Sequence, residues 1–364
     1  MGLSGDLDPI SPPKYFGLNR WGMASLLIVI CAAIVSLFAY ALAPDSTSNA
    51  NQMHLSIHSQ KPGFSVKMLL LPLPEAEQPP MLQNFFLGKK PTNKEIPING
   101  FELNSDELVY YPYQPNGVLG TPIVVDLNDY ANIDLNNLVI DKRFILGTDT
   151  FGRDLLSRVI IGTRLSFSIG LVAVLISLLI GVFMGSLAGY FGGKTDAIIS
   201  WIINVTWSIP TLLLVIAITL ALGKGYWQVF IAVGLTMWVE VARVVRGQIM
   251  SVKTLPYITA VKALGLRDFR IISKHILPNI MAPVIVIASA NFASAILIES
   301  GLSFLGIGAQ PPSASWGSMI KDHYNYIALG KPYLAVVPGL CIMTLVMAFM
   351  VLGSALRDRL DVRS

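Results

Sequence analysis

The stretch that decides the fold is Arg243–Asn279, RVVRGQIMSVKTLPYITAVKALGLRDFRIISKHILPN, which lies between segments apolar enough to be membrane helices. It carries seven Lys and Arg residues against the single acidic Asp268. Gly265 and Pro278 interrupt it, which predicts short helices joined by turns. A membrane protein that holds so long a basic loop at one face is predicted to offer it to a soluble partner.

The composition places the rest of the chain in a membrane. Of the 364 residues, 53% are hydrophobic and 13% are charged, whereas soluble domains carry about 25% charged residues. Cys31 and Cys341 lie in apolar runs, which favours small core hydrophobes over a disulfide. The four His residues lack ligand spacing. We therefore predict that the chain binds no metal or cofactor of its own, and nothing in it predicts nucleic-acid binding.

Six runs approach the length of about 20 apolar residues that a helix needs to cross the hydrocarbon layer. Pro210 interrupts the third run and predicts a kinked or two-part helix there. The runs are Ala24–Leu42, Ser166–Tyr190, Ile198–Leu222, Gln228–Val245, Ile280–Ile298 and Leu334–Leu356.

The distribution of positive charge predicts the orientation of these spans. Lys and Arg in short loops stay on the cytoplasmic side, so the basic loop and the tail with Arg357, Arg359 and Arg363 are predicted to be cytoplasmic. Counting back through the spans also puts the N-terminus inside the cell. The segments Ala43–Leu165 and Glu299–Tyr333 are then outside.

The first run has a second interpretation as a cleaved signal peptide. Lys14 and Arg20 precede it, and Ala41–Ala43 resembles a small-residue cleavage site. Its apolar run is longer than that of a typical signal peptide, and its removal would leave an odd number of spans. We therefore favour a retained helix.

Residues 44–145 differ in composition from the spans. They are rich in Pro, Asn, Gln and charge, and Phe101–Tyr113 alternates in polarity like strands. A partly disordered loop is the alternative. The predicted fold class is an all-α polytopic membrane protein with an extracytoplasmic mixed or β insertion. The expected divisions are a cytoplasmic N-terminus 1–23, a first transmembrane helix 24–43, the insertion 44–145, a pre-span segment 146–161, a transmembrane domain 162–356 with the cytoplasmic loop 246–278, and a cytoplasmic tail 357–364.

The basic loop reads as two short amphipathic helices that meet at Gly265. Tyr257, Val261 and Leu264 recur at helical spacing, and a glycine readily ends such a helix. Short helices cannot bury an apolar side alone in water, so each requires the membrane bundle or a groove on a partner. A loop lying on anionic lipid is the alternative. The second helix is predicted to place Arg267, Arg270 and Lys274 on one side and Phe269, Ile272 and Ile276 on another.

Ionisable residues near the ends of the spans are weaker candidates for function. Asp149, Arg153 and Asp154 are expected to form a solvated, mutually paired turn. The spacing of Glu240 and Arg243 allows a pair on one helix face, and Arg243 and Arg246 are expected to anchor at the membrane boundary. Glu299, at the outer end of the fifth span, is the candidate for a role in a solute pathway.

A phosphate-binding loop is excluded at Ala188–Thr195. The string formally fits a relaxed pattern, but it leaves a membrane helix and does not follow a buried strand. Gly192 and Gly193 are interpreted as turn residues, and Lys194 as a charge that anchors the cytoplasmic end.

Three separated motifs resemble binding-protein-dependent ABC importer permeases, and in particular the C-type subunit of dipeptide and oligopeptide permeases. The residues that carry the resemblance are Ala260, Gly265 and Ile276–Pro278 in the basic loop, Leu146–Asp154 (LGTDTFGRD) with Ser157–Arg158 and Gly162–Arg164 before the second span, and Ser303–Gly308 (SFLGIG), Gln310–Pro312 and Ser315–Gly317 (SWG) in the outer loop.

The resemblance implies a type I importer architecture of six transmembrane helices in a bacterial inner membrane. A homologous second permease subunit would complete the pathway, two ABC ATPase subunits would use the ATP, and an extracytoplasmic solute-binding protein would deliver the solute. Glu299, Trp316 and Asp149 become candidates for lining the pathway or docking that receptor. The expected ATPase-coupling residues are Tyr257, Thr259, Ala260, Val261, Leu264, Gly265, Leu266, Arg267, Arg270, Leu277 and Pro278.

Two positions in the loop depart from the family pattern. Thr259 stands where an acidic residue is usual, and Val261 stands where a second small residue is usual. The rival function is a secondary transporter driven by an ion gradient, for which Pro210 is the supporting feature. A membrane enzyme would need a constellation of acid, base or metal ligands that the sequence does not show.

Overall fold

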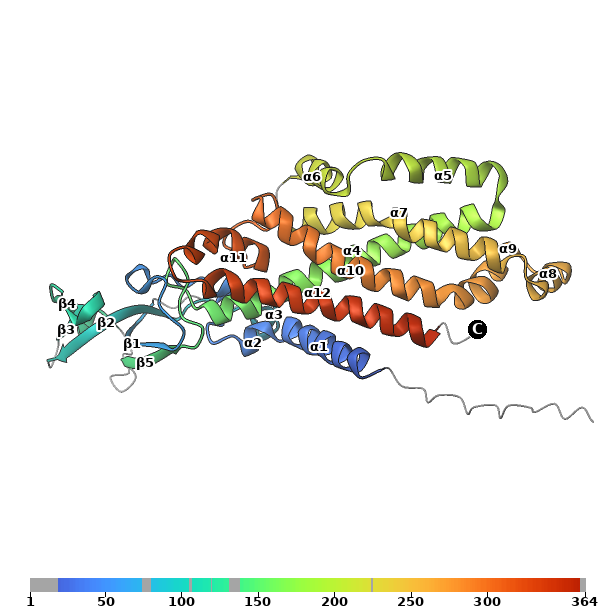
Figure 1. Ribbon diagram of the computed structural model, residues 1–364. Coiled ribbons are helices and arrows are strands. Elements are labelled where there is room, and N and C mark those ends of the chain that lie inside the picture. The colour runs from blue at the N-terminus through green and yellow to red at the C-terminus, as the bar shows by residue number, and fades with distance from the viewer. Residues whose placement is uncertain are drawn as a thin grey trace, which may run out of the picture.

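The computed structural model describes residues 19–73, 80–104, 107–118, 120–130, 138–223 and 225–360. These residues form an elongated helical bundle with a β-sheet beyond one end and a short helical loop at the other (Figure 1). We call these the sheet end (residues 43–154 with 305–332) and the loop end (residues 192–193 with 253–280). Lys14, Arg363 and most of the predicted N-terminal segment lie outside the described residues.

The helices follow the predicted spans but extend beyond several of them. Among the described residues, five helical segments are long and apolar enough to cross a membrane, or six if the bent pair α5 and α6 counts as one span. The helices are α1 (Arg20–Leu37), α2 (Ala39–Leu42), α3 (Met81–Leu87), α4 (Leu155–Phe191), α5 (Gly193–Trp207), α6 (Thr211–Leu222), α7 (Tyr226–Val252), α8 (Pro256–Ala263), α9 (Asp268–Ile271), α10 (Met281–Phe304), α11 (Trp316–His323) and α12 (Tyr333–Leu360).

Two span boundaries need correction. The helix predicted to begin at Ser166 begins at Leu155, because the Asp154 side chain caps it by accepting from the Ser157 backbone N–H at 2.9 Å. Counting apolar residues detects only the part that crosses hydrocarbon and misses such a cap. The first predicted run is also not one helix, since α1 ends at Leu37 and α2 follows Phe38.

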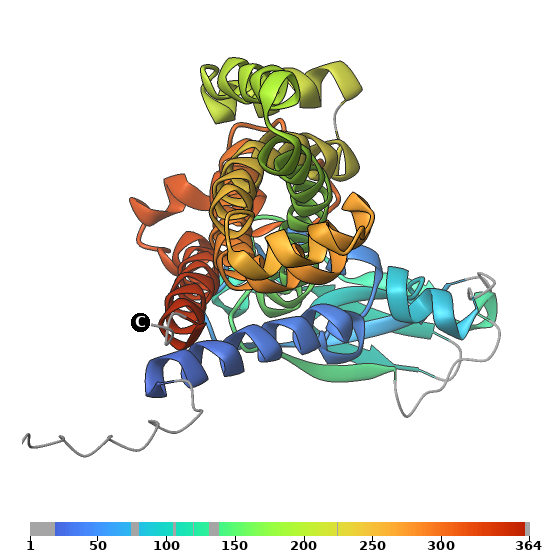
Figure 2. The same ribbon diagram turned by 90° about the vertical axis from the view of Figure 1, so that its right-hand side faces the viewer.

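The predicted break at Pro210 is confirmed. The axes of α5 and α6 differ by 90° across it. The 12 residues of α6 extend about 18 Å, less than the hydrocarbon thickness of about 30 Å. Seen from the loop end, α5 and α6 lie on one side of the bundle, and α1 and α12 lie on the opposite side (Figure 2).

Helices α4 and α7 form the central packed pair of the bundle. Gly181, Gly185 and Gly189 repeat every fourth residue along α4 and face α7. A Cβ atom added at Gly185 would lie 2.6 Å from the Ala242 carbonyl oxygen. Small residues at this spacing let two helix backbones approach closely. The glycine row therefore sets the distance between these two helices.

Replacing Gly185 by alanine is expected to destabilise the bundle by about 1–3 kcal/mol, because the added methyl group overpacks the contact with α7. The measurement is thermal unfolding in detergent. Gly247→Ala is the matched control, because a Cβ on that α7 glycine meets no atom within 4 Å. Equal unfolding temperatures for the two variants would contradict the packing argument.

The insertion is a five-stranded antiparallel sheet in the order β4-β3-β2-β1-β5. This confirms its predicted β character. Within Phe101–Tyr113, Phe101 of β2 pairs with Tyr110 of β3, and Leu69, Ile98 and Leu108 are buried in the core. The strands are β1 (Phe64–Pro72), β2 (Asn93–Leu103), β3 (Glu107–Pro112), β4 (Ile123–Asp126) and β5 (Val139–Phe144).

A half-buried charge cluster ties β2 to β5. The Lys142 ammonium donates to Glu95 Oε2 at 2.6 Å, and His54 Nε2 lies 3.4 Å from the same oxygen. Burial alone would raise the pKa of Glu95. The hydrogen bonds and charges of His54 and Lys142 outweigh that effect and hold the pKa below its usual 4.5.

The sheet is expected to loosen in acid because of this cluster. The pKa of Glu95 is lower in the folded than in the unfolded chain, so its contribution to stability is full above about pH 4.5 and is lost as the pH falls further. We expect a loss of about 1 kcal/mol or less, measured by hydrogen exchange of β1 and β2 amides. Glu95→Gln should abolish this pH dependence. If the variant keeps the pH dependence of the unaltered chain, Glu95 is not its cause.

Candidate functional site

The candidate site is the segment between α7 and α10, which we call the elbow (residues 253–280). It lies at the loop end, opposite the sheet (Figure 1). The chain turns at Gly265, whose φ of +76° is the left-handed conformation that glycine adopts without strain. The elbow consists of α8, α9, a π-helical turn at Ile272–Ile276 and a 3-10 turn at Leu277–Ile280.

Four isoleucines anchor the elbow to the bundle. Ile258 is 3% exposed, and Ile271, Ile276 and Ile280 are fully buried in a cluster with Val245 and other α7 residues. Their burial fixes the base of the elbow against the ends of α4, α7 and α10.

Polar contacts hold the same base to α4. The Tyr190 hydroxyl donates to Asp268 Oδ1 at 2.6 Å, and the Lys253 ammonium donates to the Tyr190 carbonyl oxygen. Within the elbow, Asn279 Nδ2 donates to the His275 carbonyl oxygen at 2.6 Å. A displacement of the elbow would therefore also move the ends of the spans.

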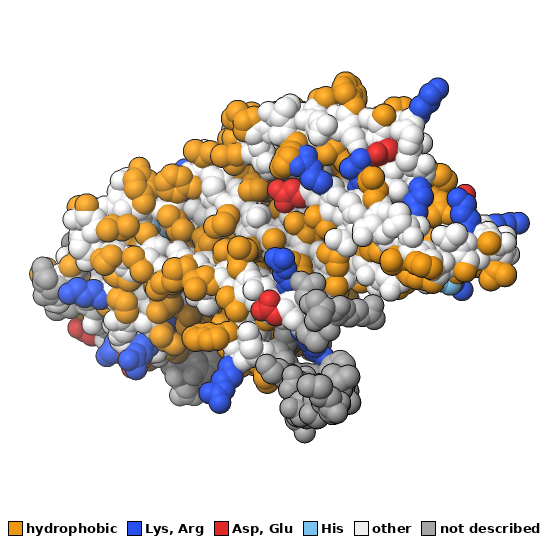
Figure 3. Space-filling view, turned by 45° about the vertical axis from the view of Figure 1, so that its right-hand side comes forward, with side chains coloured by type: hydrophobic (Ala, Val, Ile, Leu, Met, Phe, Trp, Pro, Cys, Tyr) orange, Lys and Arg blue, Asp and Glu red, His pale blue; other side chains and the backbone are white. Residues whose placement is uncertain are grey.

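The tip of the elbow has the opposite character. Leu264 is 78% exposed and Phe269 is 82% exposed, one on each side of Gly265. Among the other predicted coupling residues, Val261, Leu266 and Leu277 are half-buried, and those that are exposed are Tyr257, Thr259, Ala260, Gly265, Arg267, Arg270 and Pro278. The tip thus offers two large apolar side chains in a basic surround. Figure 3 shows Lys and Arg side chains gathered toward this end.

The predicted apolar stripes of the elbow do not all face the bundle. Leu264 and Phe269 point away from it, as the alternative of a groove on a partner allows, while Ile258 and Ile271, outside those stripes, are buried. A stripe at spacing 3.6 assumes one continuous α-helix. The turn at Gly265 and the π-helical and 3-10 turns change that period.

The motif at the sheet end is buried, which corrects the expectation of a solvated turn. Asp149 is fully buried, and Arg153 and Arg158 are 4% and 3% exposed. Arg153 Nε donates to Asp149 Oδ2 at 2.6 Å, and Arg158 Nε lies 3.7 Å from the same oxygen. The first residues of the insertion cover this group, since the Ser59 backbone N–H donates to the Asp149 carbonyl oxygen at 2.7 Å. Asp149 therefore joins the insertion to the start of α4.

Trp316 and Glu299 are also buried. Trp316 is 3% exposed, and its indole N–H donates to the Val159 carbonyl oxygen at 3.0 Å. Glu299 has no exposed surface and accepts from the Ser303 hydroxyl at 2.7 Å. In this conformation neither side chain offers surface to a receptor, and a role for Glu299 in the pathway stays a prediction.

The pair of Glu240 with Arg243 that the spacing allows does not form. The Arg243 guanidinium stacks on the Trp207 ring at 3.3 Å from its centroid. Arg246 binds Asp196 of α5, with Nη2 to Oδ2 at 2.7 Å. Both arginines thus hold α5 against α7. Sequence reasoning missed these contacts because they join separate helices. It also missed the Gly181–Gly189 repeat, although small residues at that spacing are a sequence signal for close helix packing.

Comparison with known proteins agrees with this architecture. Residues 177–363, which include the elbow, match the family described as binding-protein-dependent transport system inner membrane component. The dipeptide transport system permease protein of Bacillus subtilis is 43% identical over 215 residues, covering 59% of this chain and 67% of that protein. The glutathione transport system permease protein of Pectobacterium atrosepticum is 38% identical over 236 residues, covering 65% and 78%.

A further relative and a solved structure were also found. The oligopeptide transport system permease protein of Bacillus subtilis is 38% identical over 235 residues, covering 64% of this chain and 77% of that protein. An inward-facing methionine ABC transporter structure aligns with a TM-score of 0.46 and 18% identity, covering 55% and 94%. The family match spans more than half of the chain. The chain therefore belongs to the binding-protein-dependent inner-membrane transport components and is a permease subunit of an ABC importer.

Proposed function

We propose that this chain forms half of the solute pathway of an importer for short peptides. A homologous second permease subunit forms the other half, two ATPase subunits hydrolyse the ATP, and an extracytoplasmic protein delivers the solute. The support for peptides is that the relatives named above are described as dipeptide, oligopeptide and glutathione permeases. Nucleotide chemistry belongs to the partner subunits, and this chain supplies the pathway and the coupling surface.

The exposed tip of the elbow carries the coupling proposal. Leu264 and Phe269 expose most of their apolar surface, and paired apolar anchors on short helices are typical of helices that insert into a groove on a partner. Thr259, also exposed, keeps a hydroxyl where the related loops have an acidic residue, so it contributes a hydrogen bond in place of an ion pair.

ATP-driven closure of the ATPase would then act on the spans through the elbow. The buried base, with Ile258, Ile271 and Ile276, ties the tip to α4, α7 and α10. A partner shifts a conformational equilibrium only if it binds the two states differently. We propose that the closed ATPase pair favours the position of the elbow that belongs to the outward-open spans.

The proposed orientation puts the loop end in the cytoplasm and the sheet outside. The basic elbow obeys the positive-inside tendency. The receptor would dock at the sheet end, on the sheet and the α10–α12 connection, where Tyr324, Ile327 and Leu329 are exposed. An accessibility test checks this orientation. A reagent that does not cross the membrane should label Lys262 only from the cytoplasmic side and Lys67 only from the outer side.

Copurification tests the function against the secondary-transporter alternative. The tagged chain, expressed with its neighbouring genes, should retain two ATPase subunits. With the receptor added outside the proteoliposomes, peptide uptake should require ATP inside them. Uptake that persists without ATP and stops when the ion gradient is collapsed would overturn the proposal. An elbow that crosslinks to lipid and never to an ATPase would overturn its coupling role.

A further inference from the structure

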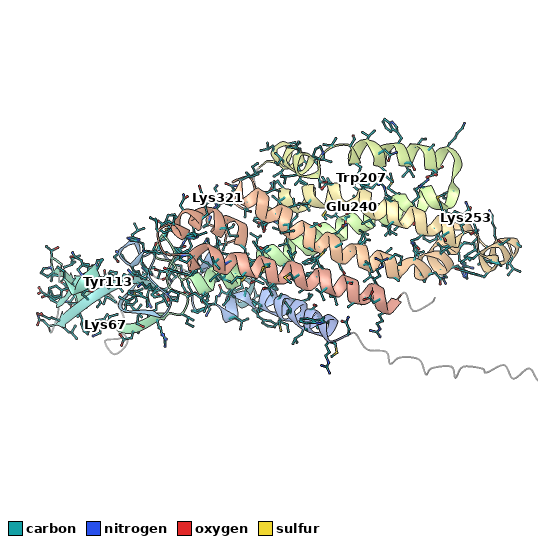
Figure 4. The ribbon with its side chains drawn as sticks, viewed as in Figure 1. Lys67, Tyr113, Trp207, Glu240, Lys253 and Lys321 are labelled. Atoms are coloured by element: carbon teal, nitrogen blue, oxygen red, sulfur yellow. The ribbon has the colours of Figure 1, made fainter. Side chains whose placement is uncertain are left out.

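A largely apolar cavity that contains one carboxylate lies where α5 and α6 separate. Its volume is about 330 Å³. Glu240 of α7 and Trp207 of α5 lie next to each other at this place (Figure 4). The lining residues that bear on its chemistry are Thr206, Trp207, Thr211, Thr236, Glu240 and Ser294. The cavity therefore combines one carboxylate, several hydroxyls and an apolar wall.

Glu240 lies near the middle of helix α7, one turn before Arg243. Helix α7 begins at Tyr226 and ends at Val252, so Glu240 is about 21 Å from its start and about 18 Å from its end at 1.5 Å per residue. Figure 4 places it between Lys321, toward the sheet end, and Lys253, at the loop end. A carboxylate on a membrane-spanning helix is costly unless it faces water or a counter-charge, and such residues mark solute or ion routes.

The rest of the described chain gives this carboxylate no counter-charge. Within residues 19–360, apart from the undescribed positions, no side chain forms an ion pair or hydrogen bond with Glu240. Arg243, the nearest cation along the helix, is held on the Trp207 ring, and Arg246 is bound to Asp196. Glu240 is exposed to the cavity. The Glu240 carboxylate can therefore still accept hydrogen bonds from a ligand.

The neighbouring hydroxyls could complete a binding site for a polar group. Thr206 and Thr236 donate to backbone carbonyls of their own helices, which leaves their oxygen lone pairs as acceptors. Thr211 and Ser294 are exposed, and their hydroxyls have no hydrogen-bond partner among the described residues. An ammonium group has three donors and no acceptor. A carboxylate with hydroxyl oxygens around it matches that requirement.

We infer that this cavity is a station on the solute pathway where Glu240 receives the protonated amino group of the passing peptide. The inference rests on the proposed function and deepens it, because it names the part of the peptide that is recognised and the residue that recognises it. The apolar wall around Trp207 accommodates varied side chains, so the contact selects for a free amino terminus and not for a sequence.

The test is uptake by the complete importer in proteoliposomes, with a short peptide and its N-acetylated form as probes. Both probes are first checked for measurable binding to the receptor. Glu240→Gln should lower kcat/KM for the free-amine peptide about 10-fold to 100-fold, the value of a hydrogen bond to a charged group, and change that of the acetylated peptide less than about twofold. Glu240→Asp should restore most of the loss. Asp358→Asn, at an exposed carboxylate in the last turn of α12, is the control and should change neither.

The outcomes separate this inference from the function on which it rests. Equal losses for both probes, or no loss for either, would overturn the amino-group contact while leaving peptide import intact. Weaker copurification of the second permease subunit with Glu240→Gln would show that Glu240 pairs with that subunit, which also overturns it. If the wild-type importer carries neither probe, the peptide assignment fails and this inference fails with it.

Discussion

Replacing Leu264 and Phe269 together by aspartate is expected to abolish ATP-driven uptake while the chain still folds in the membrane. Both side chains are largely exposed at 78% and 82%, so their loss removes no packing from the bundle. In a partner groove each apolar anchor is worth about 2 kcal/mol or more. The pair should therefore weaken ATPase binding about 1000-fold, measured by copurification of the ATPase with the tagged chain.

The control for this variant is a matched pair of exposed side chains at the other end of the molecule. Leu55 and Phe101 are 67% and 39% exposed in the insertion. Leu55→Asp with Phe101→Asp makes the same chemical change and should leave ATPase binding unaltered. If the elbow variant retains the ATPase as well as this control does, the exposed tip is not the coupling surface.

The second large effect is expected at Asp149. Asp149→Asn keeps the size of the side chain but removes the charge that faces Arg153 and Arg158, both nearly fully buried. Leaving buried cations without their partner costs about 3–5 kcal/mol. We expect a matching loss in the free energy of unfolding, and earlier proteolysis of the insertion, because the Asp149 backbone holds residue Ser59.

Asp196→Asn provides the comparison, because it makes the same substitution at another arginine-paired aspartate. The Asp196 and Arg246 side chains are 20% and 31% exposed, and partly exposed ion pairs contribute about 1 kcal/mol or less. The two variants should therefore differ by several-fold in destabilisation. Equal destabilisation would show that burial does not govern the strength of these pairs.

Several elements of the fold were predictable because their signals are local. The six apolar runs, the break at Pro210 and the β character of the insertion each depend on residues that are adjacent in the chain. Gly265 was also predictable as a turn, since few other residues adopt its φ of +76°. The elbow was predictable as a site from its basic residues, from Gly265 and Pro278, and from its resemblance to the related loops.

The burial of particular side chains could not be predicted in the same way. Asp149 looked like part of an exposed turn because the segment that covers it, around Ser59, lies far away in the sequence. Glu240 looked like the partner of Arg243 three residues on, but Trp207, from another helix, takes the arginine instead. Each error came from assigning a contact by sequence distance alone.

The sequence by itself determined that this chain crosses a membrane several times, carries a β insertion and presents a basic elbow. Apolar length, charge bias and glycine conformation are properties of short segments, and these features need nothing more. The tertiary structure alone decided which apolar residues of the elbow face outward, that Asp149 is buried, and that Glu240 lines a cavity without a partner among the described residues. Burial and pairing depend on which distant segments pack together, and no short segment contains that information.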